Sequence, residues 1–573
     1  MKQVNLLIAT AIGLVSIFGC SKSEPINLKN TSLIPEPYSF QGYSGSPFIL
    51  NENTDISYSD VSLQKIAQQF SSDIHQQTGI SLSVAGNSSN KESKTIFLEL
   101  SDNIPALNDL PKVNGISPKD GNPVDEQYLL TISSKRIHIN ATAPEGIYRG
   151  LTSLRQLMNS VEDNNKEIQL VPLEIKDSPR FAWRGLSYDV SRYFSEVSEV
   201  KKVIDMLSLY KMNVMHWHLT DNQGWRIEIK KYPLLTEVGS QVPNRNRKGG
   251  YYSQEQYKEI VQYAADRFIT VVPEIDFPGH TAAVFASYPE LKNAVTPRYL
   301  KLNIGGLSLG ALDPEDEKTM EFVKGVFTEL AAITPGSYIH IGGDEAFGMP
   351  EEKFIKFINN VIPIVKGAGK KVVGWQEIAR ADIGAEEIFQ HWIKIDIEKM
   401  LSSGNQSQIS MLPPEIQKLL IETFTGAEKD VELGIGKHAK TIISPTSFSY
   451  LDSPYGETSS DTSQEEDRSR LGLRSYPLVT LEEFYSWDPT TIDSRISIDN
   501  IAGIEAAIWC ETVESFSDLQ FLVLPRLTGL AEKGWSQESA GNWADYGARL
   551  GSQSPLWNKA EWNFFKASSI DWK

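Results

Sequence analysis

The sequence predicts an α/β protein in which a (β/α)8 barrel of the TIM type follows a small α/β (α+β) domain. Its 573 residues are too many for one ordinary domain. From Arg180 onward, short apolar segments alternate repeatedly with polar loops and helix-like segments, whereas the region before Ser178 mixes two helices with short strands. We therefore expect three parts, at residues 1–20, 21–178 and 179–573.

An apolar stretch close to the N-terminus predicts a processing signal. Lys2 precedes the run Leu6 to Phe18, and Ile-Phe-Gly-Cys at 17–20 is followed by a polar segment. This pattern resembles a bacterial lipoprotein signal in which Cys20 is acylated and residues before it are removed. An uncleaved anchor helix is the alternative, but the run falls short of the roughly 20 residues that span a bilayer. We expect a lipid-anchored protein of the bacterial cell envelope, in the periplasm or at the surface, with the outer membrane favoured.

The small domain, residues 21–178, shows helical and strand patterns in turn. Asp60 can cap a helix over 57–79 that ends at Gly79 and carries an apolar stripe of Leu63, Ile66, Ala67, Phe70 and Ile74. Strands are expected at 81–85, 95–100, 127–132 and 136–140. A second helix from Pro144 places Ile147, Leu151, Leu154 and Leu157 on one face. None of these residues suggests chemistry.

The barrel, residues 179–573, is predicted from eight short apolar segments. They lie near 183–190, 212–219, 268–275, 338–343, 371–375, 386–391, 440–444 and 502–509, and a helix is expected at 253–267. In such barrels the active site lies at the carboxyl ends of the strands. The polar segment 453–470 is expected to form a surface loop.

Composition restricts the possible partners. The formal net charge is −18, and no run of Lys or Arg occurs, which argues against nucleic acid or an anionic membrane surface as a partner. If Cys20 carries a lipid, Cys510 is the one remaining cysteine, so an internal disulfide is excluded in the mature chain.

The ends of the predicted strands carry carboxylates, an arginine and several tryptophans. Hydroxyl groups bind charged donors and acceptors, and the apolar face of a sugar ring stacks on indole, so such a barrel mouth suits a neutral sugar. Each residue also has a structural alternative. A single Trp more often packs in the core, His216 and His218 could ligate a metal or be hydrogen-bonded core residues, Asp189 and Arg192 could form an ion pair, and Asp276 could cap a turn.

The run His-Ile-Gly-Gly-Asp-Glu at 340–345 is the most informative motif. Glycoside hydrolysis usually needs two carboxyl groups across the scissile bond, roughly 5–9.5 Å apart. Adjacent side chains rarely converge on one bond in that way, so Asp344 and Glu345 must divide the work differently. The preceding glycine pair would let a ligand approach the backbone.

These motifs together resemble the β-N-acetylhexosaminidases of glycoside hydrolase family 20. The resemblance extends from about residue 33 to 537 and is carried by residues 183–194, 216–226, 272–280, 340–345, 374–375, 450–452, 509–511 and 524–535. It implies that the small domain is non-catalytic. It also implies substrate-assisted catalysis, in which the 2-acetamido oxygen of the substrate is the nucleophile, with no metal and no cofactor.

Roles for individual residues follow from the resemblance. Glu345 would be the general acid and then the base, Asp344 would accept the acetamido N–H, and Tyr450 would donate to the acetamido oxygen. Asp221 and His280 would support Glu345 through hydrogen bonds, and Asp276 would lie behind them. Trp375, Trp392 and Trp509 would wall the acetamido pocket, and Arg192, Asp452 and Glu511 would bind ring hydroxyls of a terminal GlcNAc or GalNAc.

Two segments depart from a simple barrel, and three other functions remain possible at this point. Residues 396–440 and 453–470 are long enough to reshape the rim. A relative that releases disaccharides, in the manner of a lacto-N-biosidase, is one alternative, and a glycan-binding lipoprotein without turnover is another. The third is a metal-dependent hydrolase that uses His216, His218, His280 and an Asp as ligands.

Overall fold

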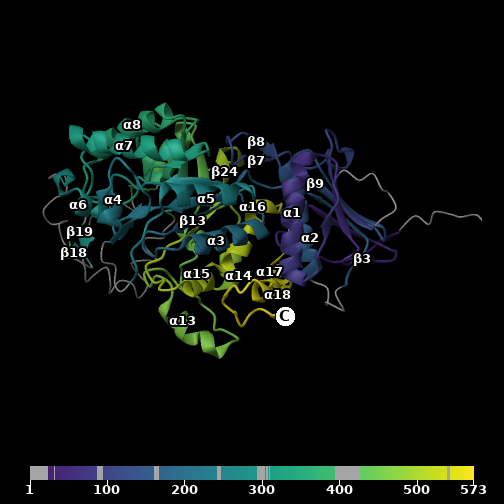
Figure 1. Ribbon diagram of the computed structural model, residues 1–573. Helices are drawn as coiled ribbons and strands as arrows, with labels where there is room; N and C mark the ends of the chain where they lie inside the picture. Colours follow the sequence, from purple (N-terminus) through teal and green to yellow (C-terminus); the bar gives the residue numbers. More distant parts are fainter. Residues whose placement is uncertain are drawn as a thin grey trace, which may run out of the picture.

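A computed structural model gives the arrangement of the chain (Figure 1). It describes residues 24–30, 32–86, 94–159, 167–241, 247–292, 303–304, 307–308, 310–393, 414, 426–427, 429–537 and 542–573. Cys20 and the predicted signal lie outside these residues, as does most of the first half of segment 396–440. In the described part of the chain, no helix has both the length and the apolar character that crossing a bilayer requires.

The N-terminal domain is built on a mixed sheet in the order β1-β2-β12-β9-β10-β6-β4-β5. β10 pairs in parallel with β6, which pairs in parallel with β4, and β9 pairs antiparallel to both β10 and β12. The strands of the domain are β1 Pro25–Ile26, β2 Ser39–Tyr43, β3 Phe48–Leu50, β4 Asp55–Tyr58, β5 Ser83–Val84, β6 Thr95–Leu100, β7 Asn114–Ile116, β8 Pro123–Asp125, β9 Tyr128–Ile132, β10 Arg136–Ala141, β11 Ile168–Leu170 and β12 Leu173–Asp177.

Two helices cover the face of this sheet that is turned toward the barrel (Figure 1). α1 spans Gln64–Thr78 and ends at Gly79, whose φ of 75° is the left-handed conformation that glycine adopts without strain. The predicted stripe is buried, but the α-helix begins later than expected because Asp60 caps a preceding 3-10 turn at Val61–Leu63. α2 spans Pro144–Asn159, and Tyr148 on it hydrogen-bonds Ser208 of the barrel at 2.7 Å.

The barrel is closed by eight parallel strands, as predicted. In order they are β13 Trp183–Asp189, β14 Val214–His218, β17 Thr270–Glu274, β20 Tyr338–His340, β21 Lys371–Trp375, β22 Ile388–His391, β23 Lys440–Ile443 and β24 Ile501–Ile508, and β24 pairs with β13. Nearly every residue of these strands is buried, as expected where a sheet is covered on both faces. The fourth strand is shorter than the predicted 338–343, because Gly342 and Gly343 have positive φ angles.

Helices surround the barrel and pack its outer face. The longer ones are α3 Val197–Leu209, α5 Gln254–Ala265, α7 Glu317–Ile333, α8 Glu351–Gly367, α15 Phe516–Val523 and α16 Arg526–Trp535, and the C-terminal segment adds α17 Trp543–Gly551 and α18 Ser554–Lys559. Shorter helices on the loops are α4 Leu234–Glu237, α6 Ala282–Ser287, α12 Thr446–Ser449 and α14 Leu481–Tyr485. α5 matches the helix predicted at 253–267.

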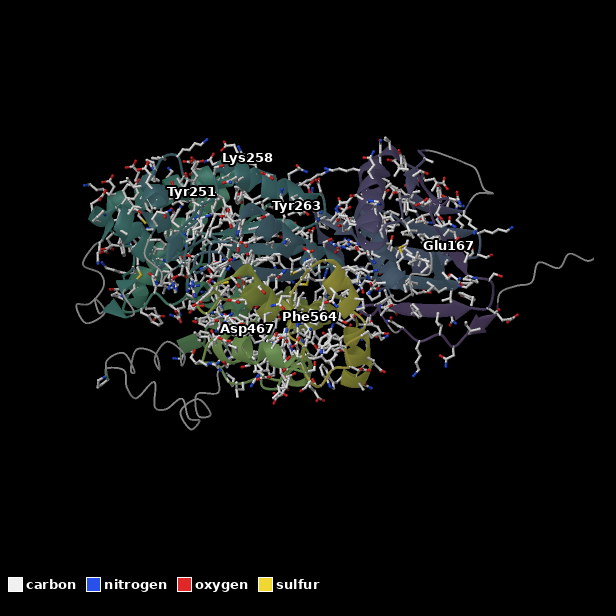
Figure 2. All side chains as sticks on the ribbon, turned by 60° about the horizontal axis from the view of Figure 1, so that its bottom comes forward. Glu167, Tyr251, Lys258, Tyr263, Asp467 and Phe564 are labelled. Carbon is white, nitrogen blue, oxygen red and sulfur yellow. The ribbon has the colours of Figure 1, made fainter. Side chains whose placement is uncertain are left out.

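The prediction that segment 453–470 is simply a surface loop was wrong. It contains a 3-10 turn at Thr462–Gln464 and helix α13, Glu465–Arg470, with acidic residues in the first turn and Arg468 and Arg470 in the last. Gln464 hydrogen-bonds the carbonyl of Phe564 at 2.8 Å, and Lys566 hydrogen-bonds Asp461 at 2.9 Å; Figure 2 labels Phe564 and Asp467. The segment is therefore folded against the C-terminal part of the chain.

Buried ion pairs join the N-terminal domain to the barrel. Glu126 accepts hydrogen bonds from Arg149 at 2.8 Å and from Arg184, at the start of β13, at 2.7 and 2.9 Å. Asp177 accepts from Lys211 and from the Tyr128 hydroxyl, both at 2.7 Å. Arg184 and Lys211 precede or begin their strands, so this contact covers the amino end of the barrel, away from the predicted site.

Candidate active site

Every predicted site residue within the described part of the chain lies at or just after the carboxyl end of a barrel strand. Arg192 follows β13, Asp221 follows β14 in the short strand β15 (Thr220–Asp221), and Asp276 and His280 follow β17. The remaining residues follow the later strands in turn: Asp344 and Glu345 after β20, Trp375 at the end of β21, Trp392 after β22, Tyr450 and Asp452 after β23, and Trp509 and Glu511 after β24.

The glycine pair before Asp344 is required by the protein itself. Gly342 and Gly343 have φ of 71° and 108°, which ends β20 at His340 because these angles leave the strand region. A Cβ on Gly342 would lie 2.0 Å from an oxygen of Asp276, and one on Gly343 would lie 2.7 Å from Ile378. The pair therefore leaves room for Asp276 and the Ile378 side chain, and the expectation that it also lets a ligand approach the backbone stays a prediction.

His280 stands between Asp221 and the adjacent carboxylates. Its Nδ1 lies 3.2 Å from Asp221 Oδ1, a hydrogen-bonding distance. Its Nε2 lies 3.6 Å from both Glu345 Oε2 and Asp344 Oδ2, which is an ion-pair distance and not a hydrogen bond. Both His280 and Glu345 have positive φ, 50° and 46°, a strained conformation that occurs at functional sites.

Burial and neighbouring charges shift the pKa values of His280 and of the carboxylates around it. Burial opposes protonation of His280, but Asp221, Asp276 and Asp344 together raise its pKa well above the usual value. Burial raises the pKa of Glu345, against the charges of His280 and Arg192. Burial and then Asp276 raise the pKa of Asp344 well above its usual value, and burial raises the pKa of Asp276 to about 6. The carboxylates therefore retain protons at a pH where free carboxylates are ionised.

Aromatic side chains form a cluster separate from the main core, made of Trp375, Trp392, Tyr450, Tyr476 and Trp509. Ring centroids of Trp375 lie 6.3 Å from Trp392 and 5.7 Å from Trp509, and Tyr450 lies 5.9 Å from Trp509. Trp375 and Trp392 are 1% and 8% exposed, so they are buried as the packing alternative required. They pack with one another and with Ala507, apart from the main core, so their burial also fits a pocket wall.

Unpaired carboxylate oxygens also occur at the barrel mouth. Both side-chain oxygens of Asp452, which is 1% exposed, and Oε2 of Glu511 lack a hydrogen-bond partner among the described residues. Burial, followed by the charge of Glu511, raises the pKa of Asp452 well above its usual value. Arg192 lies 2.7 Å from Asp221 and 3.9 Å from Glu511. Buried acceptors without donors need an explanation, and a ligand with several hydroxyl groups supplies one.

The structural alternatives for the pair Asp189–Arg192 and for Asp276 can now be judged. Arg192 lies 3.3 Å from Asp189, so the proposed ion pair is present. Asp276 does not cap its own turn, because its oxygen receives only a long 3.4 Å contact from the amide of Gly343.

Two buried glutamates beneath the site were not predicted from the sequence. Glu274 and Glu505 enclose His216, whose Nε2 lies 3.0 Å from Glu274 and whose Nδ1 lies 2.8 Å from Glu505. Burial opposes protonation of His216, but both glutamates raise its pKa to about 9. His218 bridges Glu274 at 2.5 Å and Asp221 at 3.0 Å. The available signal was an acidic residue inside each of two apolar strands.

These contacts bear on the metal-site alternative. His216, Glu274 and His340 offer ligand atoms within 4.8 Å of one another, as do the sets His218, Asp221, Asp276 and Asp276, His280, Asp344. Within the described ranges, no such set unites His216, His218 and His280, and both ring nitrogens of His216 and of His218 already contact carboxylates. The three histidines therefore do not form the single ligand set that this alternative needs.

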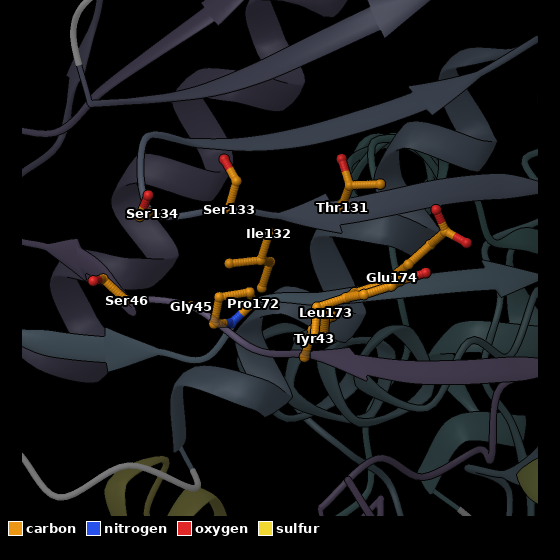
Figure 3. Close-up of a pocket in the computed structure, with 10 residues that line it drawn as sticks. All are labelled: Tyr43, Gly45, Ser46, Thr131, Ile132, Ser133, Ser134, Pro172, Leu173 and Glu174. Carbon is orange, nitrogen blue, oxygen red and sulfur yellow. The ribbon is translucent and has the colours of Figure 1, made fainter. Parts of the chain in front are cut away.

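A separate surface pocket lies on the N-terminal domain and not at these carboxylates. It has a volume of about 300 Å³ and is lined by residues at the ends of β2, β9 and β12, among them Tyr43, Thr131 and Glu174 (Figure 3). Glu174 is the one ionisable carboxylate in its lining, so the pocket lacks the paired acids of the barrel mouth.

Comparison with known proteins gives a consistent result. The family described as "Glycosyl hydrolase family 20, catalytic domain" matches residues 181–538, and "Glycosyl hydrolase family 20, domain 2" matches residues 30–178. The chain is 33% identical over 451 residues to a β-N-acetylhexosaminidase of Cellulomonas fimi, covering 78% of this chain and 82% of that protein. It is 28% identical over 571 residues to a β-hexosaminidase of Porphyromonas gingivalis, of which it spans 65%.

A solved structure resembles the whole fold. The N-acetyl-β-hexosaminidase of Streptomyces plicatus in complex with Thio-NAglucal matches with a TM-score of 0.78 and 33% identity, over 96% of this chain and 99% of that one. Both domains are included in this coverage. Fold, family match and identity agree with the motifs at the strand ends, and the chain belongs to glycoside hydrolase family 20, a family of retaining, substrate-assisted hydrolases.

Proposed function

We propose that the chain removes terminal, non-reducing β-linked N-acetylhexosamine from glycans with retention of configuration, using the 2-acetamido group of the substrate as nucleophile. One observation carries the proposal: Asp344 and Glu345 are adjacent and lie at the same 3.6 Å distance from His280. Two carboxylates on the same side of a site cannot act as acid and opposing nucleophile. The nucleophile must come from elsewhere, and a 2-acetamido sugar carries one.

In this mechanism Glu345 performs both proton transfers. It protonates the leaving oxygen in the first step and removes a proton from water in the second. Burial favours its protonated form before the first step, and positively charged His280 stabilises the carboxylate that remains after it. Asp221 holds His280 in place from the other side.

Asp344 and Tyr450 bind and orient the acetamido group. One oxygen of Asp344, Oδ1, has no hydrogen-bond partner within the described ranges and can accept the acetamido N–H. That hydrogen bond, together with the positive charge that develops as the ring closes, favours the ionised form of Asp344. Burial raises the pKa of Tyr450 well above its usual value, so its hydroxyl remains a donor for the acetamido oxygen.

The remaining residues hold the sugar ring. Trp375, Trp392 and Trp509 enclose the acetamido group and support the ring, while Asp452, Glu511 and Arg192 bind its hydroxyls. A ring whose far hydroxyls are bound in this way has no room for a further sugar on that side, which favours removal of a terminal residue.

The nucleophile can be tested with aryl β-N-acetylglucosaminides that carry zero to three fluorine atoms on the acetyl methyl group. Fluorine withdraws electrons from the acetamido oxygen, so kcat/KM should fall steeply along the series, by roughly tenfold or more overall. Equal rates along the series would contradict substrate assistance. Folded protein that binds N-acetylhexosamine glycans without hydrolysing any member would indicate a binding protein.

We further propose, from the sequence motif alone, that the mature chain is anchored through a lipid on Cys20 to the bacterial cell envelope. Replacement of Cys20 by Ala should move the protein from the detergent phase to the aqueous phase in a detergent partition experiment. An unmodified Cys20 in mass spectra of the mature protein would contradict the anchor.

A further inference from the structure

Two tryptophans of the aromatic cluster are each held by a buried glutamate. The indole N–H of Trp375 donates to Glu274 Oε1 at 2.7 Å, and that of Trp392 donates to Glu377 Oε2 at 3.1 Å. Glu274 also contacts His216 and His218, so its oxygens are well occupied. Glu377 is 2% exposed, and its Oε1 has no hydrogen-bond partner in the part of the chain that the structure describes.

We infer that Glu377 is a positioning residue that sets the size of the acetamido pocket, and therefore the length of N-acyl chain accepted, by fixing the indole of Trp392. This inference rests on the proposed function, because it takes the aromatic cluster as the acetamido pocket.

The local structure supports such a role. Glu377 lies in the 3-10 helix Gln376–Arg380, which begins directly after Trp375 at the end of β21. Its neighbour Gln376 accepts hydrogen bonds from His391 Nδ1 at 2.8 Å and from the amide of Ile393 at 3.2 Å. Gln376 therefore anchors the side chain of the residue before Trp392 and the backbone of the residue after it, and Glu377 anchors the orientation of the indole ring.

The charge of Glu377 acts on Asp344. Its negative charge contributes to the raised pKa of Asp344, the residue that would receive the acetamido N–H. Burial and then Asp430 raise the pKa of Glu377 itself to about 7, because Arg380 forms its two hydrogen bonds, at 2.8 and 2.7 Å, with Asp430. Glu377 is thus a buried acid whose side chain holds the indole of Trp392, and among the described residues no other side chain is recorded in a hydrogen bond to it.

The consequence concerns specificity more than rate. Trp392 packs edge-to-face on Trp375, with 6.3 Å between the ring centres and 74° between the ring planes, so a rotation of its indole changes the shape of the wall that the two rings form together. Room for one methylene group in an apolar pocket changes discrimination by roughly 10- to 200-fold. Loss of the hydrogen bond that fixes the ring should therefore relax selection against longer acyl chains.

The test compares kcat/KM for aryl β-glucosaminides with N-acetyl, N-propanoyl and N-butanoyl groups. Glu377→Leu and Trp392→Phe each remove one partner of the hydrogen bond and should raise the propanoyl-to-acetyl ratio by about tenfold. Glu377→Gln keeps an acceptor oxygen and should retain the ratio of the parent enzyme. In the double variant Glu377→Leu/Trp392→Phe the change should not exceed that of Trp392→Phe, because Trp392→Phe already removes the hydrogen bond to Glu377.

Glu387 provides the matched control. It is 4% exposed, directly precedes β22, and accepts from Lys366 at 3.0 Å and from the amide of Gly384 at 2.8 Å. Glu387→Leu should lower the melting temperature without changing the ratio. A parental ratio in folded Glu377→Leu, or an equal rise in Glu387→Leu, would overturn the inference.

The remaining outcomes are also decisive. If Glu377→Leu does not fold, Trp392→Phe carries the test, and a parental ratio in that variant would overturn the inference. Failure of the unaltered enzyme to hydrolyse the N-acetyl substrate would instead contradict the proposed function.

Discussion

Carboxylates are buried at both ends of the barrel, but the hydrogen-bond partners of these carboxylates differ between the two ends. At the amino end, Glu126 is surrounded by Arg149 and Arg184, and Asp177 binds Lys211 and Tyr128. At the carboxyl end, neither oxygen of Asp452 has a hydrogen-bond donor among the described residues, and Asp344 has one oxygen without a donor. A buried charge is costly unless it is paired, so the first arrangement joins two domains and the second awaits a ligand.

The pKa shifts follow the same division. Burial opposes ionisation of Glu126, yet Arg184 and Arg149 lower its pKa below the usual value. Burial and then the charge of Glu511 raise the pKa of Asp452 well above its usual value, and the charge of Arg526 offsets this rise only in part. In this molecule, buried acids that have cationic partners are structural, and buried acids that lack hydrogen-bond donors mark the functional site.

The largest expected effect is on catalysis at the carboxyl end. Glu345→Gln should lower kcat/KM for a glycoside with a poor leaving group by roughly 10³-fold, because the proton donor is lost. An aryl glycoside with a very acidic leaving group should be affected much less in its first step. Steady-state and burst kinetics on the two substrates measure this difference, and equal losses on both would argue against Glu345 as the acid.

The next effect concerns the amino end and should appear in stability. Glu126→Gln leaves Arg184 and Arg149 without their buried counter-charge and should lower the free energy of unfolding by about 3 kcal/mol. The value of kcat/KM per folded molecule should be unchanged, because the pair lies away from the catalytic carboxylates. Urea unfolding with parallel kinetics tests both statements; a selective loss of activity would break the comparison.

Asp452→Asn should lower activity without lowering stability, the reverse of Glu126→Gln. Loss of charged hydrogen bonds to the sugar should reduce kcat/KM by about 30- to 100-fold, as expected for about 2–3 kcal/mol. The melting temperature should stay the same or rise, because an unpaired buried acid is removed. A clear fall in melting temperature would mean that Asp452 has a structural partner.

The smallest effect is a dependence of stability on pH. The folded-state pKa of Asp276, about 6, is raised above the ordinary value of 3.8, so the folded protein holds this proton more tightly than the unfolded chain. That contribution is fully present below about pH 4 and is lost as the pH rises through 6. Relative to Asp276→Asn, the parent should lose about 1 kcal/mol or more between pH 4 and 7 in urea unfolding. A constant difference would contradict the raised pKa.

Much of the fold was predictable because buried parallel strands are short, apolar and bounded by loops. All eight barrel strands were located in this way. The end of β20 was misplaced, because Ile341 continues the apolar run while the positive φ of Gly342 and Gly343 breaks the strand. Helix α13 was missed because its six residues are polar and too short to show a helical period.

The residues that form the site could be predicted from the sequence, but the buried residues that hold them in place could not. Carboxylates and tryptophans at strand ends were visible in the motifs. Glu274, Glu377 and Glu505 were not selected, because their importance depends on partners far away in the chain: Trp375, Trp392 and His216. Only folding brings these pairs together.

Binding of a thiazoline mimic of the cyclised acetamido group, measured by calorimetry, tests the contrast between the two ends most directly. Such a mimic resembles the charged intermediate and its hydroxyls reach the acids of the mouth. We expect equal affinity for the unaltered enzyme and Glu126→Gln, and an affinity about 10- to 100-fold weaker for Asp452→Asn. Equal affinity in all three proteins, or weakening in Glu126→Gln alone, would contradict this expectation.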